Sequence, residues 1–535
     1  MLSLISRHYF SRPVFSLSFS SFLVCLFLLA SAAPVSSCWH CLVCRPSSLI
    51  PPCVYSFNRH PHQLQLAMLT NILPLLLSIP SLAVAEDVLG IYVFHRHGDR
   101  TAKAWKPVNL TALGADEVHS SGEWYRDTYV DNDASRKIKG LSADTAVLSQ
   151  LDVTAPVDAV LQNSALVFLQ GLYPPLKQTE TLANGTKVEA PLSGYQSIPV
   201  NSVANAASAK GSENSAWLQG NSGCTNAEVS SNAYLSSTEY KASYQGSLDF
   251  YKDLLPIING TYGEANATFK NAYSIFDLIN VARIHNSSIP SDNLLNKPTL
   301  DRLYNLASVH EWNLAYNKTD ASRAVAGAVL AGQILESLEP LANGQPGHPK
   351  FNIQFGAYGT FMAFFGSAGL DKASSDFLGI CDYASSMAIE LVTNATKPTV
   401  DDVKVRFYFA NGTAAENTPR LFPLFGQKEE TLSWKDFKTG MSKFAIEDDA
   451  EWCKLCGNSD DTCSGNGTST SSSDSDSDSG SGNGISKAVA GVIGALVTLA
   501  VILGIELLVM LLGGLRLVKK STLAAARSAN GGVKA

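Results

Sequence analysis

The residues best suited to chemistry in this chain form one short run, RHGDR, at residues 96–100. Arg96 and Arg100 flank an imidazole, and each guanidinium offers a planar set of donors that matches phosphate oxygens. Gly98 lets the backbone bend tightly and approach an anion. A neutral His97 can attack phosphorus through one ring nitrogen when a hydrogen bond holds the other. The run therefore indicates phosphoryl chemistry, with His97 as the catalytic residue and Arg96 and Arg100 as phosphate-binding residues.

The elements around this run should place it at a sheet edge. VLGIYVFH, at 88–95, is rich in β-branched and aromatic residues and predicts a buried strand. Open α/β sheets bind ligands beyond the carboxyl ends of their strands, which is where the run begins. A helix is predicted at 110–129, a strand at 145–150 and a second helix at 156–175, where glycine and prolines end it.

The middle of the chain changes character. Residues from about 205 to 340 carry mostly helical patterns, and strand patterns return at 351–358, 381–392 and 403–412. The order is α/β, then a helical block, then α/β again. This order predicts an α/β fold in which one sheet is flanked by helices and carries a mostly helical insertion at about 205–340.

Both ends of the chain carry segments outside this pattern. Residues 68–85 are apolar and end in an A-x-A-like site, which predicts a signal peptide, with 1–67 as an upstream extension or extra leader. The globular segment is expected at 86–456. Three further segments follow: a Ser/Gly/Asp-rich stalk at 457–487, a single transmembrane helix at 488–515 and a basic tail at 516–535. The basic tail predicts a cytosolic C-terminus, hence a type I protein of the plasma membrane or secretory pathway.

Sequons and cysteines agree with a lumenal or extracellular ectodomain. Nine N-x-S/T sequons lie between the signal peptide and the predicted span: Asn109, Asn184, Asn259, Asn266, Asn286, Asn317, Asn394, Asn411 and Asn466. The ectodomain has five cysteines, which should pair by disulfides and leave one over. The Cys453–Cys456 C-x-x-C spacing is expected to be structural rather than redox-active.

Composition excludes other classes of function. The chain has 535 residues, of which 45% are apolar, so it can bury a large core. Its formal net charge of −7 gives no sign of nucleic-acid binding.

The RHGDR run and the later GLYPP at 171–175 resemble the sequence pattern of the histidine acid phosphatases, within the phosphoglycerate-mutase-like histidine phosphatases, and are most similar to fungal membrane-anchored members. The resemblance covers most of residues 87–456. It implies the fold of that superfamily and hydrolysis of phosphate monoesters through a phosphohistidine at His97. Arg96 and Arg100 match the family's two phosphate-binding arginines. Family members take phosphate or a small phosphomonoester and need no metal or organic cofactor.

The sequence departs from the family pattern before GLYPP. Ala102 stands where the family has a proline. A third phosphate-binding arginine is expected near Ser149 or Ala159, yet the chain has no arginine between Arg136 and Arg283.

A second departure removes the family's His-acid pair, which protonates the leaving group. The matching positions are Tyr358 and Gly359, or Ala357 and Tyr358 after a one-residue shift. His348 should lie roughly 30 Å away, at the far end of the strand, and His310 is expected to be a packing or surface residue. Two functions stay open: a phosphatase that takes its acid from elsewhere, or a catalytically weak or inactive pseudophosphatase that acts as a phosphoester-binding or structural surface glycoprotein.

Overall fold

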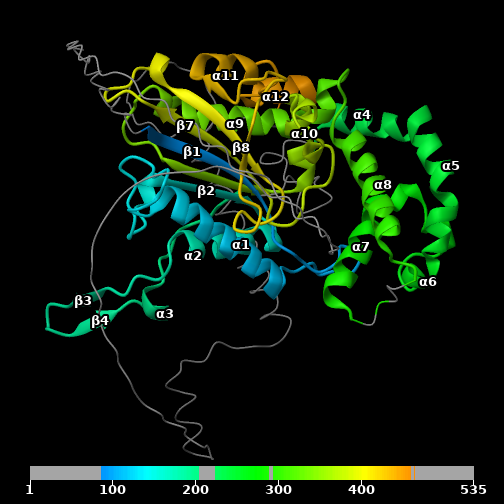
Figure 1. Ribbon diagram of the computed structural model, residues 1–535, viewed down its shortest axis with the longest axis horizontal. Helices are drawn as coiled ribbons and strands as arrows, with labels where there is room; N and C mark the ends of the chain where they lie inside the picture. The colour runs from blue at the N-terminus through cyan, green and yellow to red at the C-terminus, as the bar shows by residue number, and fades with distance from the viewer. Residues whose placement is uncertain (1–85, 204–222, 288, 290–292, 460–462, 464–535) are drawn as a thin grey trace, which may run out of the picture. The chain divides into compact units, whose positions relative to one another are not determined.

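The computed structural model describes residues 86–203, 223–287, 289, 293–459 and 463 (Figure 1). The predicted leaders, most of the stalk, the predicted transmembrane helix, the basic tail and the Asn466 sequon lie outside these residues.

The described chain is built from both strands and helices. The strands are β1 (Asp87–Arg96), β2 (Leu151–Pro156), β3 (Thr179–Thr181), β4 (Lys187–Glu189), β5 (Asn201–Val203), β6 (Phe351–Gly356), β7 (Ser386–Thr393), β8 (Lys404–Ala410), β9 (Arg420–Phe422) and β10 (Thr431–Ser433). The α-helices are α1 (Ala112–Tyr125), α2 (Ala159–Leu172), α3 (Pro191–Gly194), α4 (Thr225–Leu235), α5 (Thr238–Asp253), α6 (Leu255–Ile258), α7 (Ala272–His285), α8 (Lys297–Ala315), α9 (Val325–Ala342), α10 (Tyr358–Ser367), α11 (Trp434–Met441) and α12 (Asp449–Cys456).

One mixed sheet organises the fold, in the order β10-β8-β7-β1-β6-β2-β5, with β9 paired to β8. The strands β1, β6, β2 and β5 are parallel, whereas β7 and β8 are antiparallel to their neighbours. Parallel strands β1 and β6 end side by side, because Arg96 pairs with Gly356. The loops that follow these two strands therefore share one edge of the sheet.

Helices cover both faces of this sheet, and β1 shows why. Its residues alternate between two apolar clusters: Tyr92 and Phe94 pack with α9 and α10, whereas Ile91 and Val93 pack with α1 and α2. A strand buried on both faces carries an almost continuous apolar run, as the sequence predicts for this segment. Figure 1 shows α1 and α2 on one side of the strands and α9 and α11 on the other.

A helical block lies between β5 and β6. Helices α4 to α8 pack around a third apolar cluster, which also takes in Ala102 from the segment after β1. Figure 1 shows these helices beyond one end of the sheet. By contrast, α9 packs against the sheet within the first cluster. The helical block therefore meets the sheet near the RHGDR run.

Two expectations about secondary structure are wrong. Residues 145–150 form bends and a short 3-10 helix, and the strand begins at Leu151. Leu148 is 51% exposed, whereas β2 is mostly buried, so burial selects the later segment. The strand predicted to reach residue 358 ends at Gly356, and Tyr358 begins α10.

Two disulfides join four of the five cysteines that the structure describes. They join Cys224 to Cys456 and Cys453 to Cys463, while Cys381 is a buried free thiol. The expectation of one unpaired cysteine is therefore confirmed. Cys453 and Cys456 belong to different bridges, so the C-x-x-C spacing does not form a redox pair.

One described helical stretch, Ala321–Ala342, is long and apolar enough to cross a membrane. In its most apolar window 72% of the residues are buried inside the fold, as expected for a core helix.

Candidate active site

The RHGDR loop, residues 96–100, is almost fully shielded from solvent. Arg96 ends β1, and the side chains that follow turn into the interior: His97 is 1% exposed and Arg100 is 0% exposed. The three residues proposed from the sequence therefore lie together at the carboxyl edge of the sheet, where the strand pattern placed them.

Backbone contacts hold this loop against the helices. A Cβ on Gly98 would lie 2.1 Å from the carbonyl oxygen of Gly114, in the first turn of α1. The loop and the helix can therefore approach this closely only because both residues are glycine. The Gly98 amide donates to Ser164 Oγ on α2, at 3.3 Å. The loop thus has little room to move.

His97 is held in a defined orientation. Its Nδ1 lies 2.8 Å from the carbonyl oxygen of Gly98. Because a carbonyl only accepts, Nδ1 carries the hydrogen in this bond, and the lone pair of the neutral ring is on Nε2. The imidazole lies beside the ring of Tyr383, with centroids 5.7 Å apart. The hydrogen bond thus sets the tautomer of the ring, which a nucleophilic role of His97 would require.

Three tyrosines, Tyr273, Tyr358 and Tyr383, form a tyrosine cluster around the loop's cations. The Arg96 guanidinium carbon lies 4.7 Å from the ring centroid of Tyr383 and 5.4 Å from that of Tyr358. Burial is the largest influence on Tyr273 and Tyr383 and raises the pKa of both hydroxyls. The two groups are therefore neutral hydroxyls over the whole acidic range.

Arg100 is already paired with a carboxylate. Both oxygens of Asp277, on α7, accept from its guanidinium, at 2.8 and 3.3 Å, and Tyr273 accepts a further bond at 3.0 Å. Arg100 is 0% exposed and Asp277 is 3% exposed, so the pair is buried. Sequence reasoning missed Asp277, which lies in a helix without any motif.

Lys103 adds a third cation beside the loop. Its ammonium lies 5.2 Å from the ring centroid of Tyr273 and 5.8 Å from that of Tyr358, and its backbone amide donates to Asp277. Ala159, where the third arginine is expected, is exposed on the first turn of α2, and Ser149 is exposed in the 3-10 helix. Lys103, only three residues after Arg100, instead brings a cation to the tyrosine cluster.

A second carboxyl group supports the back of the loop. Glu117 on α1 accepts from the Asp99 amide at 2.7 Å. Burial raises the pKa of Glu117 to about 7, against the lowering effect of this hydrogen bond. The Asp99 carboxylate is fully buried and contacts Thr111 and His285, the latter at 2.6 Å. Asp99 is therefore engaged in holding the loop to α1 and α7.

The expected His-acid positions hold no acid. Tyr358 and Gly359 form the first turn of α10, directly after β6. Instead, the Tyr358 hydroxyl donates to Glu311 Oε2 at 2.8 Å, and Glu311 Oε1 lies 2.7 Å from His310 Nδ1. His310 is buried against Phe269, as expected of a packing residue, but it also contacts this carboxylate. His348 is exposed before β6 begins.

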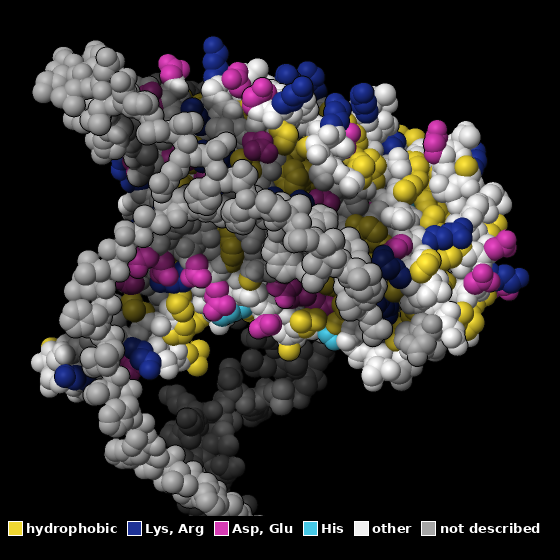
Figure 2. Space-filling model, viewed as in Figure 1, with side chains coloured by type: hydrophobic (Ala, Val, Ile, Leu, Met, Phe, Trp, Pro, Cys, Tyr) yellow, Lys and Arg dark blue, Asp and Glu magenta, His cyan; other side chains and the backbone are white. Residues whose placement is uncertain are grey.

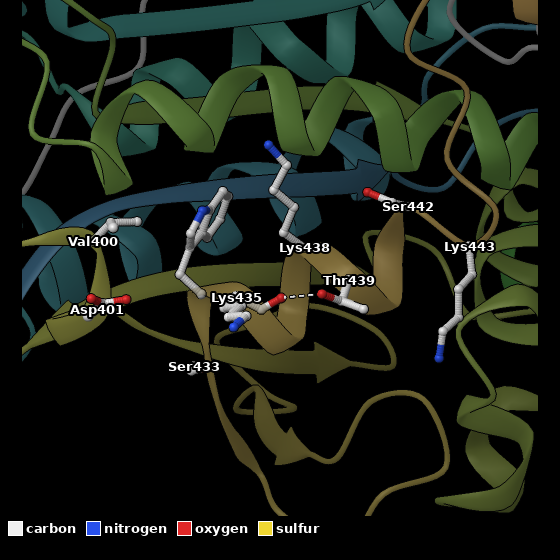
Figure 3. Close-up of a pocket in the computed structure, with 9 residues that line it drawn as sticks. Val400, Asp401, Ser433, Lys435, Lys438, Thr439, Ser442 and Lys443 are labelled. Atoms are coloured by element: carbon white, nitrogen blue, oxygen red, sulfur yellow. Dashed lines mark hydrogen bonds between the residues drawn. The ribbon is translucent and has the colours of Figure 1, made fainter.

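A groove elsewhere on the molecule shares no residue with this site. It has a volume of about 690 Å³ and is lined by Lys435, Lys438 and Lys443 on and after α11 (Figure 3). In Figure 3, Lys438 points toward α9, where it pairs with Glu339, whereas Lys443 points away. Figure 2 shows several basic side chains, with acidic ones among them, along the upper edge of the molecule, where Figure 1 labels α11. Lys438 is already paired with Glu339, so the groove does not present it as an unpaired charge to a ligand.

Among the described residues, no group of three or more His, Cys, Asp or Glu side chains is arranged to hold a metal ion.

No protein-family model matches the chain. It is 23% identical over 412 residues to a lysosomal acid phosphatase of Xenopus laevis, covering 73% of this chain and 84% of that protein. That relative is by its name an acid phosphatase, and the similarity agrees with the resemblance of the RHGDR run, at the carboxyl end of β1, to the histidine acid phosphatases.

Solved structures similar to this chain include two phytases. Hafnia alvei phytase in complex with tartrate has a TM-score of 0.47 and 11% identity, covering 70% of this chain and 98% of that one. Citrobacter braakii phytase has a TM-score of 0.46 and 13% identity, covering 69% and 99%.

Proposed function

We propose that this protein hydrolyses phosphate monoesters through a phosphohistidine on His97. The observation that carries the proposal is the hydrogen bond from Nδ1 to the Gly98 carbonyl, which fixes the tautomer with its lone pair on Nε2. Arg96 and Arg100 lie in the same buried loop and supply positive charge beside that nitrogen.

The reaction takes two steps. In the first, Nε2 attacks phosphorus, an N–P bond forms, the ester P–O bond breaks and the leaving oxygen takes up a proton. In the second, water attacks the phosphohistidine, the N–P bond breaks, inorganic phosphate leaves and the water gives up a proton. The protein contributes position and compensating charge, which are the main requirements of phosphoryl transfer.

Lys103 adds to the positive charge that the two arginines provide. Arg96, Arg100 and Lys103 are three cations around the tyrosine cluster, and Asp277 offsets one of them. The sum exceeds one positive charge, so the site still favours an anion.

Assays of the full-length chain, purified from a secretory host in detergent, test this proposal. Release of nitrophenol from p-nitrophenyl phosphate is expected at acidic pH, and His97→Ala should reduce it to the uncatalysed rate. Equal rates for the wild type and His97→Ala would contradict the proposal that the protein is a phosphatase.

The Arg100–Asp277 pair favours a second candidate, a weak or inactive pseudophosphatase that binds a phosphoester or serves as a structural surface glycoprotein. An arginine that already binds a carboxylate with both arms has fewer donors left for phosphate. Phosphate or vanadate that raises the melting temperature without turnover would support the binder. A protein unaffected by either anion would support a structural role.

We further propose a type I, membrane-anchored glycoprotein of the secretory pathway or plasma membrane, similar to the fungal anchored members. The two disulfides support an oxidising compartment, and the relative is by its name lysosomal. Six of the eight described sequons, all but Asn317 and Asn411, have exposed asparagines that glycans can reach. Glycosidase treatment of the full-length chain should lower its apparent mass, and carbonate extraction should leave it in the membrane.

A further inference from the structure

A chain of hydrogen-bonding groups runs from the helical block to the active site. His310 Nδ1 lies 2.7 Å from Glu311 Oε1, and Glu311 Oε2 accepts from the Tyr358 hydroxyl at 2.8 Å. Each carboxylate oxygen thus has its own partner, one from α8 itself and one from α10. A carboxylate that is satisfied on both sides in this way has a defined orientation.

This chain of groups ends beside two cations of the proposed site, Arg96 and Lys103. Gly356 pairs with Arg96 across β6 and β1, and Tyr358 follows two residues later. The Arg96 guanidinium carbon lies 5.4 Å from the Tyr358 ring centroid, and the Lys103 ammonium lies 5.8 Å from it. Tyr358 therefore occupies the edge of the site at which the family places its acid.

Helix α8 is fixed to this edge by one of its faces. Tyr304 donates to the carbonyl oxygen of Ile380, Ser308 accepts from the Ile380 amide, and Glu311 accepts from Tyr358. Residues spaced by four and then three positions lie on one face of a helix. The position of Glu311 is therefore set by two further contacts and does not depend on Tyr358 alone.

The chain is also largely removed from solvent. The side chains of His310 and Glu311 are 8% and 17% exposed, and Tyr358 is 8% exposed. Hydrogen bonds in such a setting are stronger and better aligned than those at a surface. The three polar side chains are thus buried together rather than paired by chance at the surface.

We propose that Tyr358 is the proton donor to the leaving oxygen and that Glu311, held by His310, positions the Tyr358 hydroxyl. This inference rests on the function proposed above. As the ester P–O bond breaks, the phenolic proton moves from its hydrogen bond with Glu311 to the leaving oxygen. In the second step the attacking water returns a proton to the phenolic oxygen, so the hydrogens balance over one turnover. Glu311 and His310 act through Tyr358 and are positioning residues.

A phenol is a strong enough acid for this task. Its reference pKa near 10 makes it a weaker acid than a carboxyl group but a far stronger one than an alcohol. Proton transfer to a departing alkoxide is thus favourable. A nitrophenolate needs no proton to leave, so Tyr358 matters only for poor leaving groups.

This difference in leaving groups gives the test. Full-length protein carrying Tyr358→Phe, Glu311→Gln or His97→Ala is assayed on p-nitrophenyl phosphate and on glycerol phosphate. Tyr173→Phe and Glu339→Gln serve as matched controls, because each removes a comparable polar contact outside the site.

Tyr358→Phe should lower kcat on glycerol phosphate by roughly 100-fold or more, with KM and the rate on p-nitrophenyl phosphate changed less than about threefold. Glu311→Gln should lower kcat on glycerol phosphate about tenfold, whereas the controls should leave both rates unchanged. Equal falls on both substrates, or no fall on either, would overturn the role of Tyr358 as proton donor, while His97-dependent turnover would still support the phosphatase. Absence of His97-dependent turnover on both substrates would overturn the two proposals together.

Discussion

The RHGDR loop and the tyrosine cluster meet at one site but are held in different ways. In the loop, backbone packs on backbone: Gly98 and Gly114 approach so closely that neither position has space for a Cβ. In the cluster, rings pack on cations, and Gly359 beside Tyr358 has nothing within 4 Å of an added Cβ. Fixed backbone determines where His97 lies, whereas side chains determine which groups face it. The second region can therefore change its chemistry at much lower cost in stability than the first.

A pair of glycine substitutions should show this difference most strongly. Gly98→Ala places a Cβ 2.1 Å from the Gly114 carbonyl oxygen, so the loop or α1 must shift. We expect a loss of about 4 kcal/mol in the free energy of unfolding, together with loss of activity. Gly359→Ala should change stability by less than about 1 kcal/mol, since a helix position with space tolerates alanine. Urea unfolding of both variants measures the difference, and similar losses would contradict the comparison.

The second-largest effect is expected at the buried ion pair between Arg100 and Asp277, which links the loop to the tyrosine cluster. Asp277→Asn keeps the size of the side chain but leaves the Arg100 charge without its counterion. Removing one partner of a buried pair costs about 3 kcal/mol, so the variant should unfold at lower urea concentration.

Phosphate separates this electrostatic effect from general damage. Because the anion supplies the missing negative charge, phosphate should stabilise Asp277→Asn by more than it stabilises the wild type. Arg136 pairs with Glu390 elsewhere in the fold, and Glu390→Gln is the matched control, for which phosphate should give no extra stabilisation. An equal phosphate effect in all three proteins would mean that Arg100 does not face the anion.

The loop could be predicted from the sequence because its chemistry and its element are local. Five consecutive residues carry the groups, and the apolar run before them identifies a strand. Asp277 lies 177 positions from Arg100 and sits in an ordinary helix, so only the folded chain brings the two together. Glu311 is likewise one acid among many in helical sequence.

Local strand propensity gave a wrong prediction of secondary structure at two places. Residues 145–150 have strand-like composition, yet the sheet takes the following segment, whose alternate side chains can be buried. Tyr358 fits a strand by its aromatic ring, but it begins a helix because β6 ends at the sheet edge.

The carboxyl group behind the loop should make stability depend on pH. Burial raises the pKa of Glu117 to about 7 from an ordinary value of 4.5, so the folded chain holds a proton that the unfolded chain has lost. This contribution is fully present below pH 4.5 and is lost as pH rises to about 7, by about 2 kcal/mol after allowance for partial solvent contact.

A conservative variant isolates this effect. Glu117→Gln can still accept the Asp99 amide, so it should remove the pH dependence without displacing the loop. Burial lowers the pKa of His95 to about 4, which gives the opposite slope in the same range but is common to both proteins. The difference in unfolding free energy between variant and wild type should therefore grow in favour of the variant from pH 5 to pH 7. A constant difference would show that Glu117 is ionised at both pH values.

The smallest effect is expected at the cation that the cluster shares with the loop. If Lys103 substitutes for the missing arginine, it attracts phosphate in the ground state and the transition state alike, so Lys103→Gln should mainly raise KM. We expect about a tenfold fall in kcat/KM, since an ammonium that is partly exposed and stacked on rings acts as a weak point charge. Lys106→Gln, an exposed lysine in the same segment, is the control. A fall in kcat at constant KM would instead assign Lys103 to the transition state, and an unchanged KM and kcat would leave Arg96 and Arg100 as the whole phosphate site.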